Sequence, residues 1–267
     1  MPFYTSRINT TTGPILTGAS DVNSTYNSFV LTLRKRMSGG IEFVGNYTLA
    51  KASDGGQVPG QFGTFNGTDT PIDPYNRKLE WGRSDLDQRS RFTGNLVYIP
   101  QFTKKIANPA LRYLLHGYAF STILTVAAGQ PVTGTISGNV SGAIAGGPTG
   151  GAVNNSGTAT GGRSPGLPRN YYTGPGMGDF DLRVSREFVI TEKVKLSLLG
   201  EAFNLTNHTN VFTVNTQQYT YTAAGSGACS GHSNGCLVPV SSFLTPSATN
   251  NNLFGARQLQ ISGRITF

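Results

Sequence analysis

The sequence predicts an all-β protein: an antiparallel transmembrane β-barrel, or part of one, with about seven or eight strands. Apolar and polar residues alternate over stretches of about 9–11 residues, the length with which a tilted strand crosses a bilayer. Charged residues make up only 13% of the chain, about half the share in a typical soluble domain. Short turns and long loops alternate between the stretches. All the long loops therefore leave one end of the sheet, and all the short turns leave the other.

The final segment, 257–267 (RQLQISGRITF), shows the alternation most clearly. Successive side chains of a strand point to opposite faces, so this segment has one apolar and one polar face. The apolar face consists of Leu259, Ile261, Gly263, Ile265 and Phe267. An apolar-out, polar-in strand that ends on an aromatic residue is typical of the closing strand of a barrel. The alternative for this segment alone is a half-buried strand of a soluble sandwich.

The rest of the chain also contains segments of alternating apolar and polar residues, separated by turns and loops. Residues 1–24 are expected to form a loop or a weak strand, with a short strand near 3–8, and residues 25–267 the barrel portion. Ser38, Gly39 and Gly40 form a tight turn, because glycine tolerates the positive φ that such turns need. Before the final strand, we expect strands at 25–37, 41–51, 89–99, 115–127, 179–189 and 194–204. Short connections are expected at 38–40, 100–110 and 191–193, and long loops at about 52–88, 129–177 and 205–252.

Composition and charge argue against other classes of protein. The net charge of +8 could indicate nucleic-acid binding, but the basic residues are scattered apart from the run 34–36, so we expect none. No apolar stretch is long enough for a transmembrane helix. The first residues show no charged segment followed by an apolar one, so no secretory signal is visible. Since a barrel protein must be exported, we expect this chain to be a fragment.

Two features of the third long loop could carry chemistry. Cys229 and Cys236 do not have the spacing of a zinc site. In a loop that faces an oxidising compartment, they are expected to form a local disulfide. Residues 231–235 match G-x-S-x-G around Ser233, but no helical pattern follows, as a nucleophile elbow requires. The sequence therefore predicts no enzyme, no metal site and no cofactor.

Charged residues of both signs alternate where the first long loop enters its strand, and again near residue 180. Opposite charges on the polar face of a barrel wall satisfy one another, so we expect a salt-bridged cluster at the lumen or rim. Contact with a ligand is the alternative. The residues of this predicted charge cluster are Asp85, Asp87, Arg89, Arg91, Asp181 and Arg183.

Several segments, taken together and in order, resemble the C-terminal barrel portion of TonB-dependent outer-membrane receptors, particularly the Oar-like group. The combination of EAFNLTNH with an aromatic-terminated last strand is the most specific part of the match. The segments are NYTLAKASD (46–54), SDLDQRSRFTGNLVY (84–98), AAGQPVTG (127–134), GDFDLRVSREFVIT (178–191), LLGEAFNLTNHTNV (198–211) and RQLQISGRITF (257–267).

The resemblance implies a receptor with a plug inside a barrel of about 22 strands, which takes up a scarce ligand. We recognise no plug segment in this sequence, so we expect contact with the TonB system to run only through a missing region. The expected location is the cell outer membrane of a Gram-negative bacterium, with the long loops extracellular. The implied partners are outer-membrane lipid, an unknown small ligand and the barrel-assembly machinery, which would recognise Leu259, Ile261, Ile265 and Phe267.

Two other functions stay open at this stage. One is a small, self-contained outer-membrane barrel that acts as an adhesin or structural protein. The other is a secreted β-sandwich that binds carbohydrate. A sandwich would bury its apolar face in a core, whereas a barrel would leave that face open to lipid.

Overall fold

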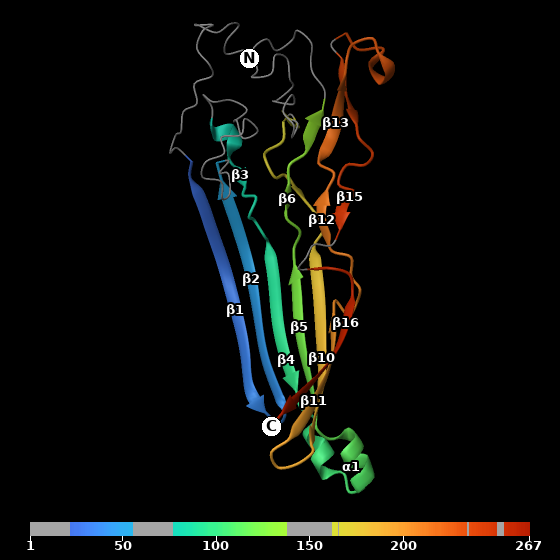
Figure 1. The fold of residues 1–267 in the computed structure, drawn as a ribbon. Helices are drawn as coiled ribbons and strands as arrows, with labels where there is room; N and C mark the ends of the chain where they lie inside the picture. The colour runs from blue at the N-terminus through green and yellow to red at the C-terminus, as the bar shows by residue number, and fades with distance from the viewer. Residues whose placement is uncertain (1–21, 56–76, 138–161, 165, 234, 250–253) are drawn as a thin grey trace, which may run out of the picture.

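The computed structural model of the chain describes residues 22–55, 77–137, 162–164, 166–233, 235–249 and 254–267. The strand predicted near residues 3–8 and the Gly-rich centre of the second long loop lie outside these ranges. The described residues form one tall, antiparallel sheet with smaller sheets at one of its ends (Figure 1).

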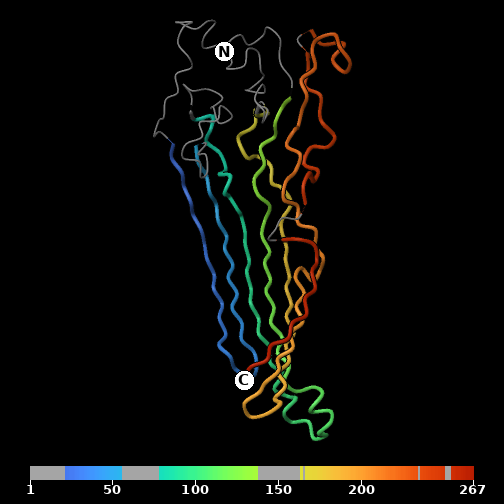
Figure 2. Tube along the Cα trace, in the orientation of Figure 1, coloured from blue at the N-terminus to red at the C-terminus, as the bar shows by residue number. Residues whose placement is uncertain are grey.

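Seven long strands run side by side in the tall sheet, and their order in space is their order in the chain (Figure 2). Each pairs antiparallel with the next, as the alternation of short turns and long loops predicts. They are β1 (Ser24–Ser38), β2 (Ile41–Asp54), β4 (Ser90–Tyr98), β5 (Tyr118–Ala127), β10 (Met177–Val189), β11 (Lys195–Phe203) and β16 (Gln258–Thr266), and the short strand β3 (Gly82–Arg83) extends the sheet beside β2.

The turn between β1 and β2 follows the prediction closely. Ser38 pairs with Ile41, so only two residues connect the strands. These residues, Gly39 and Gly40, have φ values of 63° and 81°. Positive φ at both central positions matches the right-handed twist of the flanking strands and is nearly free of steric cost for glycine.

The pairing register places the apolar residues of all seven strands on one face. Leu31 lies opposite Tyr47, which lies opposite Phe92, which lies opposite Val126. At the other side of the sheet, Leu196 lies opposite Ile265. Because paired residues point to the same face, the alternation in each strand adds up to one continuous apolar surface.

This apolar face has no covering layer among the described residues. Leu31 is 56% exposed, Val126 46% and Ile261 89%, while the buried apolar residues of the seven long strands are alanines, such as Ala50 and Ala127. A sandwich would pack a second sheet against this face. The exposed apolar face and the polar opposite face confirm the predicted arrangement of a membrane barrel wall.

The sheet is open at both sides. Within the described ranges, β1 pairs only with β2 and β16 pairs only with β11. All fifteen residues of β1 are exposed. An unpaired strand presents a row of free N–H and C=O groups, which lipid cannot satisfy. Within the described residues, the wall therefore has two unpaired edges and does not form a closed barrel.

The long loops contain regular structure that the sequence analysis did not predict. A small sheet joins the second and third loops, because β13 pairs in parallel with β7. Two further strand pairs, β6 with β9 and β12 with β15, lie between this sheet and the tall one (Figure 1). The loop strands are β6 (Pro131–Val132), β7 (Thr135–Ser137), β8 (Gly162–Arg163), β9 (Tyr172–Thr173), β12 (Val211–Val214), β13 (Gln217–Thr222), β14 (Cys236–Pro239) and β15 (Pro246–Thr249).

The connection between β4 and β5 corrects one predicted boundary. The strand expected from residue 115 begins at Tyr118, since a helix, α1 (Pro109–Leu115), precedes it. The side chain of Asn108 caps this helix, and Pro109 occupies its first turn, a favourable combination at a helix start. Among the described residues, the 3-10 helices are η2 (Arg77–Glu80), η3 (Gln101–Lys105) and η5 (Gly227–Cys229). No helix in the described part of the chain is long and apolar enough to cross a membrane.

Candidate ligand pocket at the long-loop end

Buried ion pairs tie the first and second long loops to the ends of the strands. Arg169, in the second loop, binds the carboxylate of Asp54 at the end of β2. The same guanidinium lies 3.3 Å from Asp85 Oδ1 in the first loop. Side chains of Arg169 and Asp54 are only 12% and 4% exposed. Buried charges are strongly unfavourable without partners, so this arrangement holds the two loops in one relative position.

A second set of contacts fixes the segment that leads into β4. Asp87 Oδ1 accepts a hydrogen bond of 2.7 Å from the Ala52 backbone N–H, and its Oδ2 lies 2.9 Å from Arg83 Nε. Arg83 also donates to Thr173 Oγ1, at 2.8 Å, in the second loop. The side chain of Asn170 donates to the Arg83 carbonyl at 2.8 Å. These bonds again connect the first loop with the second.

Arg163 and Glu80 make a third connection between the same loops. Arg163 Nη1 lies 3.3 Å from Glu80 Oε2, and Nη2 donates to the Leu79 carbonyl at 2.8 Å. Burial lowers the pKa of the Arg163 guanidinium below its ordinary value. The charge of Glu80 opposes that shift, and the charge of Arg169 adds to it. An arginine stays protonated despite such a shift, so this pair persists at physiological pH.

A pocket of about 600 Å³ opens beside this framework, at the ends of β4, β5 and β10. Its volume falls within the range of small-molecule sites, about 300–1,000 Å³. The second and third loops provide nearly all of its lining, and Gln88 comes from the first. The lining residues are Gln88, Ala128, Gly129, Gln130, Pro131, Val132, Thr133, Thr135, Gly174, Pro175, Met177, Asn210, Val211, Phe212, Thr213, Val214, Thr216 and Phe254.

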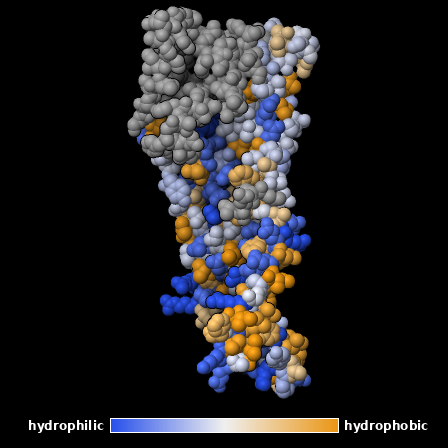
Figure 3. Space-filling model, in the orientation of Figure 1, coloured by the Kyte–Doolittle hydropathy of each residue, from blue (hydrophilic) through white to orange (hydrophobic). Residues whose placement is uncertain are grey.

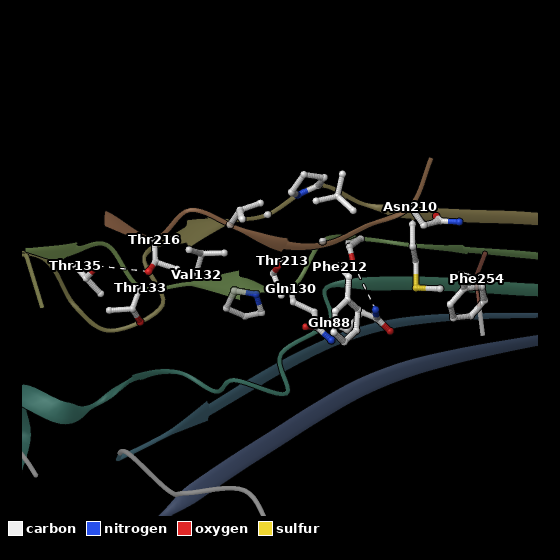
Figure 4. A pocket seen from close by; sticks show the side chains of 18 residues that line it. Gln88, Gln130, Val132, Thr133, Thr135, Asn210, Phe212, Thr213, Thr216 and Phe254 are labelled. Carbon is white, nitrogen blue, oxygen red and sulfur yellow. Dashed lines mark hydrogen bonds between the residues drawn. The ribbon is translucent and has the colours of Figure 1, made fainter. Parts of the chain in front are cut away.

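Figure 4 shows how the polar and aromatic side chains lie around the pocket. Gln88, Gln130 and Thr213 are near its middle, while Asn210 and Phe254 lie toward one end. Three threonines lie toward the other end, where the hydroxyls of Thr135 and Thr216 are 3.4 Å apart. None of the 18 lining residues carries a charge.

Asn210 is a buried polar residue of this lining. It is 5% exposed, and its Oδ1 accepts a hydrogen bond of 2.9 Å from the Gly178 backbone N–H. Its Nδ2 is buried and has no hydrogen-bond partner among the described residues. An unsatisfied buried donor is unfavourable, so the hydrogen bond to Gly178 is the contact that holds this side chain in place.

The structure does not bring the predicted charge cluster together. Asp85 and Asp87 pair with arginines that the sequence analysis did not single out. Arg89 donates to the Ala50 carbonyl at 3.3 Å, and Arg91 is exposed on the polar face at the start of β4. Asp85 and Asp87 therefore form salt bridges at the rim, but their partners are Arg169 and Arg83 and not Arg89 and Arg91.

Two predicted members of the cluster lie on the polar face of β10. Asp181 accepts a hydrogen bond of 2.9 Å from the Asn204 backbone N–H at the end of β11. Arg183 Nη2 lies 2.6 Å from Glu201 Oε1 across the same strand pair. Their roles are therefore local to the β10–β11 hairpin. They do not contact the residues near position 87.

Cys229 and Cys236 are joined in a disulfide, with Cα atoms 5.6 Å apart. It closes the tip of the third loop between η5 and β14. Ser233 lies in this tip, and a strand, not a helix, follows it. The described residues contain no group of three or more His, Cys, Asp or Glu side chains that could hold a metal ion.

The residues predicted as a barrel-assembly signal lie on the apolar face and at the end of β16. Leu259, Ile261 and Ile265 are 75%, 89% and 63% exposed, and Phe267 is 97% exposed. β16 ends at the short-turn end of the sheet (Figure 1). These residues are therefore accessible on an edge strand.

A family model described as an outer membrane beta barrel domain matches residues 2–260. The chain belongs to this family of outer membrane β-barrel domains. The match spans nearly the whole sequence, and it agrees with the exposed apolar face and the alternating loops. It places the barrel domain in the outer membrane. No curated protein and no solved structure matches the chain.

Sequence analysis missed the pocket of the barrel domain, although one signal was present. The segment AAGQPVTG, which contributed to the family resemblance, supplies Gln130, Pro131, Val132 and Thr133 to the lining. The arginines 163 and 169 carried no such signal. Their partners are about 80 to 115 positions away in the chain, so only the folded structure reveals them.

Proposed function

We propose that the barrel domain forms part of the wall of a TonB-dependent receptor, whose long loops capture a ligand for uptake. The observation that carries this proposal is the uncharged pocket at the long-loop end, held in place by buried ion pairs between the loops. The open sides of the sheet support a place within a larger barrel. The family resemblance of the loop and strand segments also supports the receptor assignment.

The lining favours an uncharged ligand rich in hydroxyl groups, such as an oligosaccharide. Amides and threonine hydroxyls can both donate and accept hydrogen bonds. Phe212, Phe254 and the two prolines provide apolar surfaces on which the face of a sugar ring can lie. A charged ligand would lose hydration without gaining a partner of opposite charge. In this proposal the protein is a receptor and not an enzyme.

Native mass spectrometry of the detergent-solubilised chain tests the site, with maltohexaose, xylohexaose and cellohexaose as probes. We expect one of them to bind, and Phe212→Ala and Asn210→Ala each to weaken binding about tenfold, the effect of losing one good contact. Leu86→Ala is the matched control, because Leu86 is 74% exposed near the same end but does not line the pocket. Failure of all three probes to bind, or equal loss with Leu86→Ala, would contradict the pocket assignment.

Uptake is tested separately in cells that produce the complete receptor. TonB-type transport draws its energy from the inner membrane, so a protonophore should abolish accumulation of the labelled oligosaccharide and leave surface binding intact. Accumulation that persists with the protonophore would mean passive diffusion through an open barrel. That result would contradict the receptor proposal.

A further inference from the structure

The connection between β4 and β5 presents an apolar and basic surface at the short-turn end. We call residues 101–117, with η3 and α1, the basal turn. No residue of α1 is buried. Its Tyr113 and Leu114 are 71% and 58% exposed, and Phe102 in η3 is 61% exposed. Large apolar side chains on a short helix stabilise it only if they pack against something.

Hydrogen bonds nevertheless hold the basal turn in a defined conformation. Thr103 Oγ1 lies 3.0 Å from His116 Nδ1 and donates to the Pro100 carbonyl at 2.7 Å, which ties the start of the turn to its end. The Asn108 side chain accepts hydrogen bonds from the backbone N–H groups of Ala110 and Leu111. The apolar surface is therefore held in a defined position.

Arg186 shows which side of the wall the basal turn occupies. It lies on the same face of β10 as Val184 and Phe188, which is the apolar face. Its guanidinium carbon lies 5.4, 5.0 and 4.4 Å from the ring centres of Tyr113, Tyr118 and Phe188. It also donates hydrogen bonds to the Tyr113 carbonyl and the Tyr118 hydroxyl. The helix is thus fastened to the outward, lipid-facing side of the sheet.

The charge of the basal turn is all of one sign. It carries Lys104, Lys105 and Arg112, and it contains no Asp or Glu. The apolar face beside it ends in aromatic residues, since Phe120 stacks with Tyr98 and with Tyr118 at 6.3 and 6.4 Å. Figure 3 shows hydrophobic surface gathered toward this end of the molecule and hydrophilic side chains at its tip.

We propose that the basal turn is an interfacial anchor that docks on anionic phospholipid headgroups of the leaflet at the short-turn end. Its leucines and aromatic rings enter the boundary between headgroups and acyl chains, where amphipathic helices and tyrosines reside. Its lysines and arginine lie above them against the phosphates. Through Arg186 and the aromatic rings around it, this surface is continuous with the lipid-facing side of the wall. This inference rests on the barrel fold alone and is independent of ligand uptake.

A single-tryptophan probe tests the depth of the basal turn. Trp81 is the only tryptophan of the chain, so Trp81→Phe combined with Leu114→Trp reports one position. The chain is reconstituted in vesicles of phosphatidylcholine and phosphatidylglycerol in equal parts, and heat-modifiable gel mobility verifies folding. We expect the tryptophan at position 114 to emit at short wavelength, and we expect brominated acyl chains to quench most of this emission. Glu192→Trp in the Trp81→Phe background is the water-exposed control from another short turn.

Lipid selectivity tests the basic residues. Brominated phosphatidylglycerol should quench the probe at position 114 more strongly than the same fraction of brominated phosphatidylcholine. Replacing Lys104, Lys105 and Arg112 by Gln should remove that difference, whereas Lys195→Gln should keep it, because Lys195 already pairs with Glu187 at 3.2 Å. Equal quenching by both lipids in the parent would overturn the headgroup assignment. Water-like, unquenched emission at position 114 would overturn the anchor altogether and assign the surface to a protein partner.

Discussion

Asp87 illustrates how single residues hold the long-loop end together. It is buried and bonds both to the Ala52 backbone and to Arg83. We expect Asp87→Ala to lower the free energy of unfolding by about 1–3 kcal/mol, because it leaves a buried N–H and a guanidinium without their acceptor. Thermal unfolding of the refolded chain in detergent, followed by circular dichroism, measures this effect.

Asp85→Ala is the matched control for that substitution. The Asp85 side chain is 47% exposed and lies 3.3 Å from Arg169, which keeps its bond to Asp54. Asn170 also donates to Asp85, and it keeps its bond to the Arg83 carbonyl. Exposed pairs contribute about 0–1 kcal/mol, so this variant should unfold close to the parent. If both substitutions had the same effect, burial would not be the property that makes Asp87 important.

At the scale of elements, the disulfide of the third loop acts locally. Cys229 and Cys236 close a small loop, which in the chain-entropy account stabilises by about 2–3 kcal/mol. We expect reduction to increase hydrogen exchange in η5 and β14 and to leave β10 and β11 unchanged. Mass spectrometry of peptides with and without reductant provides the comparison within one protein. A lower unfolding temperature of the whole sheet would show that the tip supports more than itself.

At the scale of the whole molecule, the two faces of the wall should respond differently to charge. Leu124 lies on the apolar face of β5, and its neighbour Thr125 lies on the polar face opposite Asp179. Leu124→Arg should cost about 2–4 kcal/mol when the residue lies near the bilayer midplane. Thr125→Arg should be nearly neutral, since it gains a carboxylate neighbour. Urea unfolding in lipid vesicles measures both, and equal costs would contradict the assignment of the faces.

The sequence was sufficient for the seven long strands of the tall sheet because their signal is local. Alternation predicted 41–51 where the structure has Ile41–Asp54, and 179–189 where it has Met177–Val189. The connection before β5 is the exception. Asn108 and Pro109 start a helix there, where only a short connection was expected. A cap followed by proline was visible in the sequence, but a helix of seven residues is too short for a helical period to show.

The pocket could not be predicted in the same way because it depends on pairing between distant segments. Gln217 in β13 lies opposite Thr135 in β7, and no turn or spacing brings these strands together. The alternating residues of β13, QQYTYT, could have indicated a strand. They could not have indicated its partner. The ion pairs of Arg163 and Arg169 share this property.

The parallel pairing of β13 with β7 limits how the long loops can be re-engineered. Loops of barrels are commonly exchanged one at a time to graft a new specificity, on the assumption that each is a separate module. Here the second and third loops share a sheet, and both line the pocket. A graft of residues 129–177 would have to be accompanied by 205–252 from the same donor, so the two segments are expected to be inherited and exchanged as one unit.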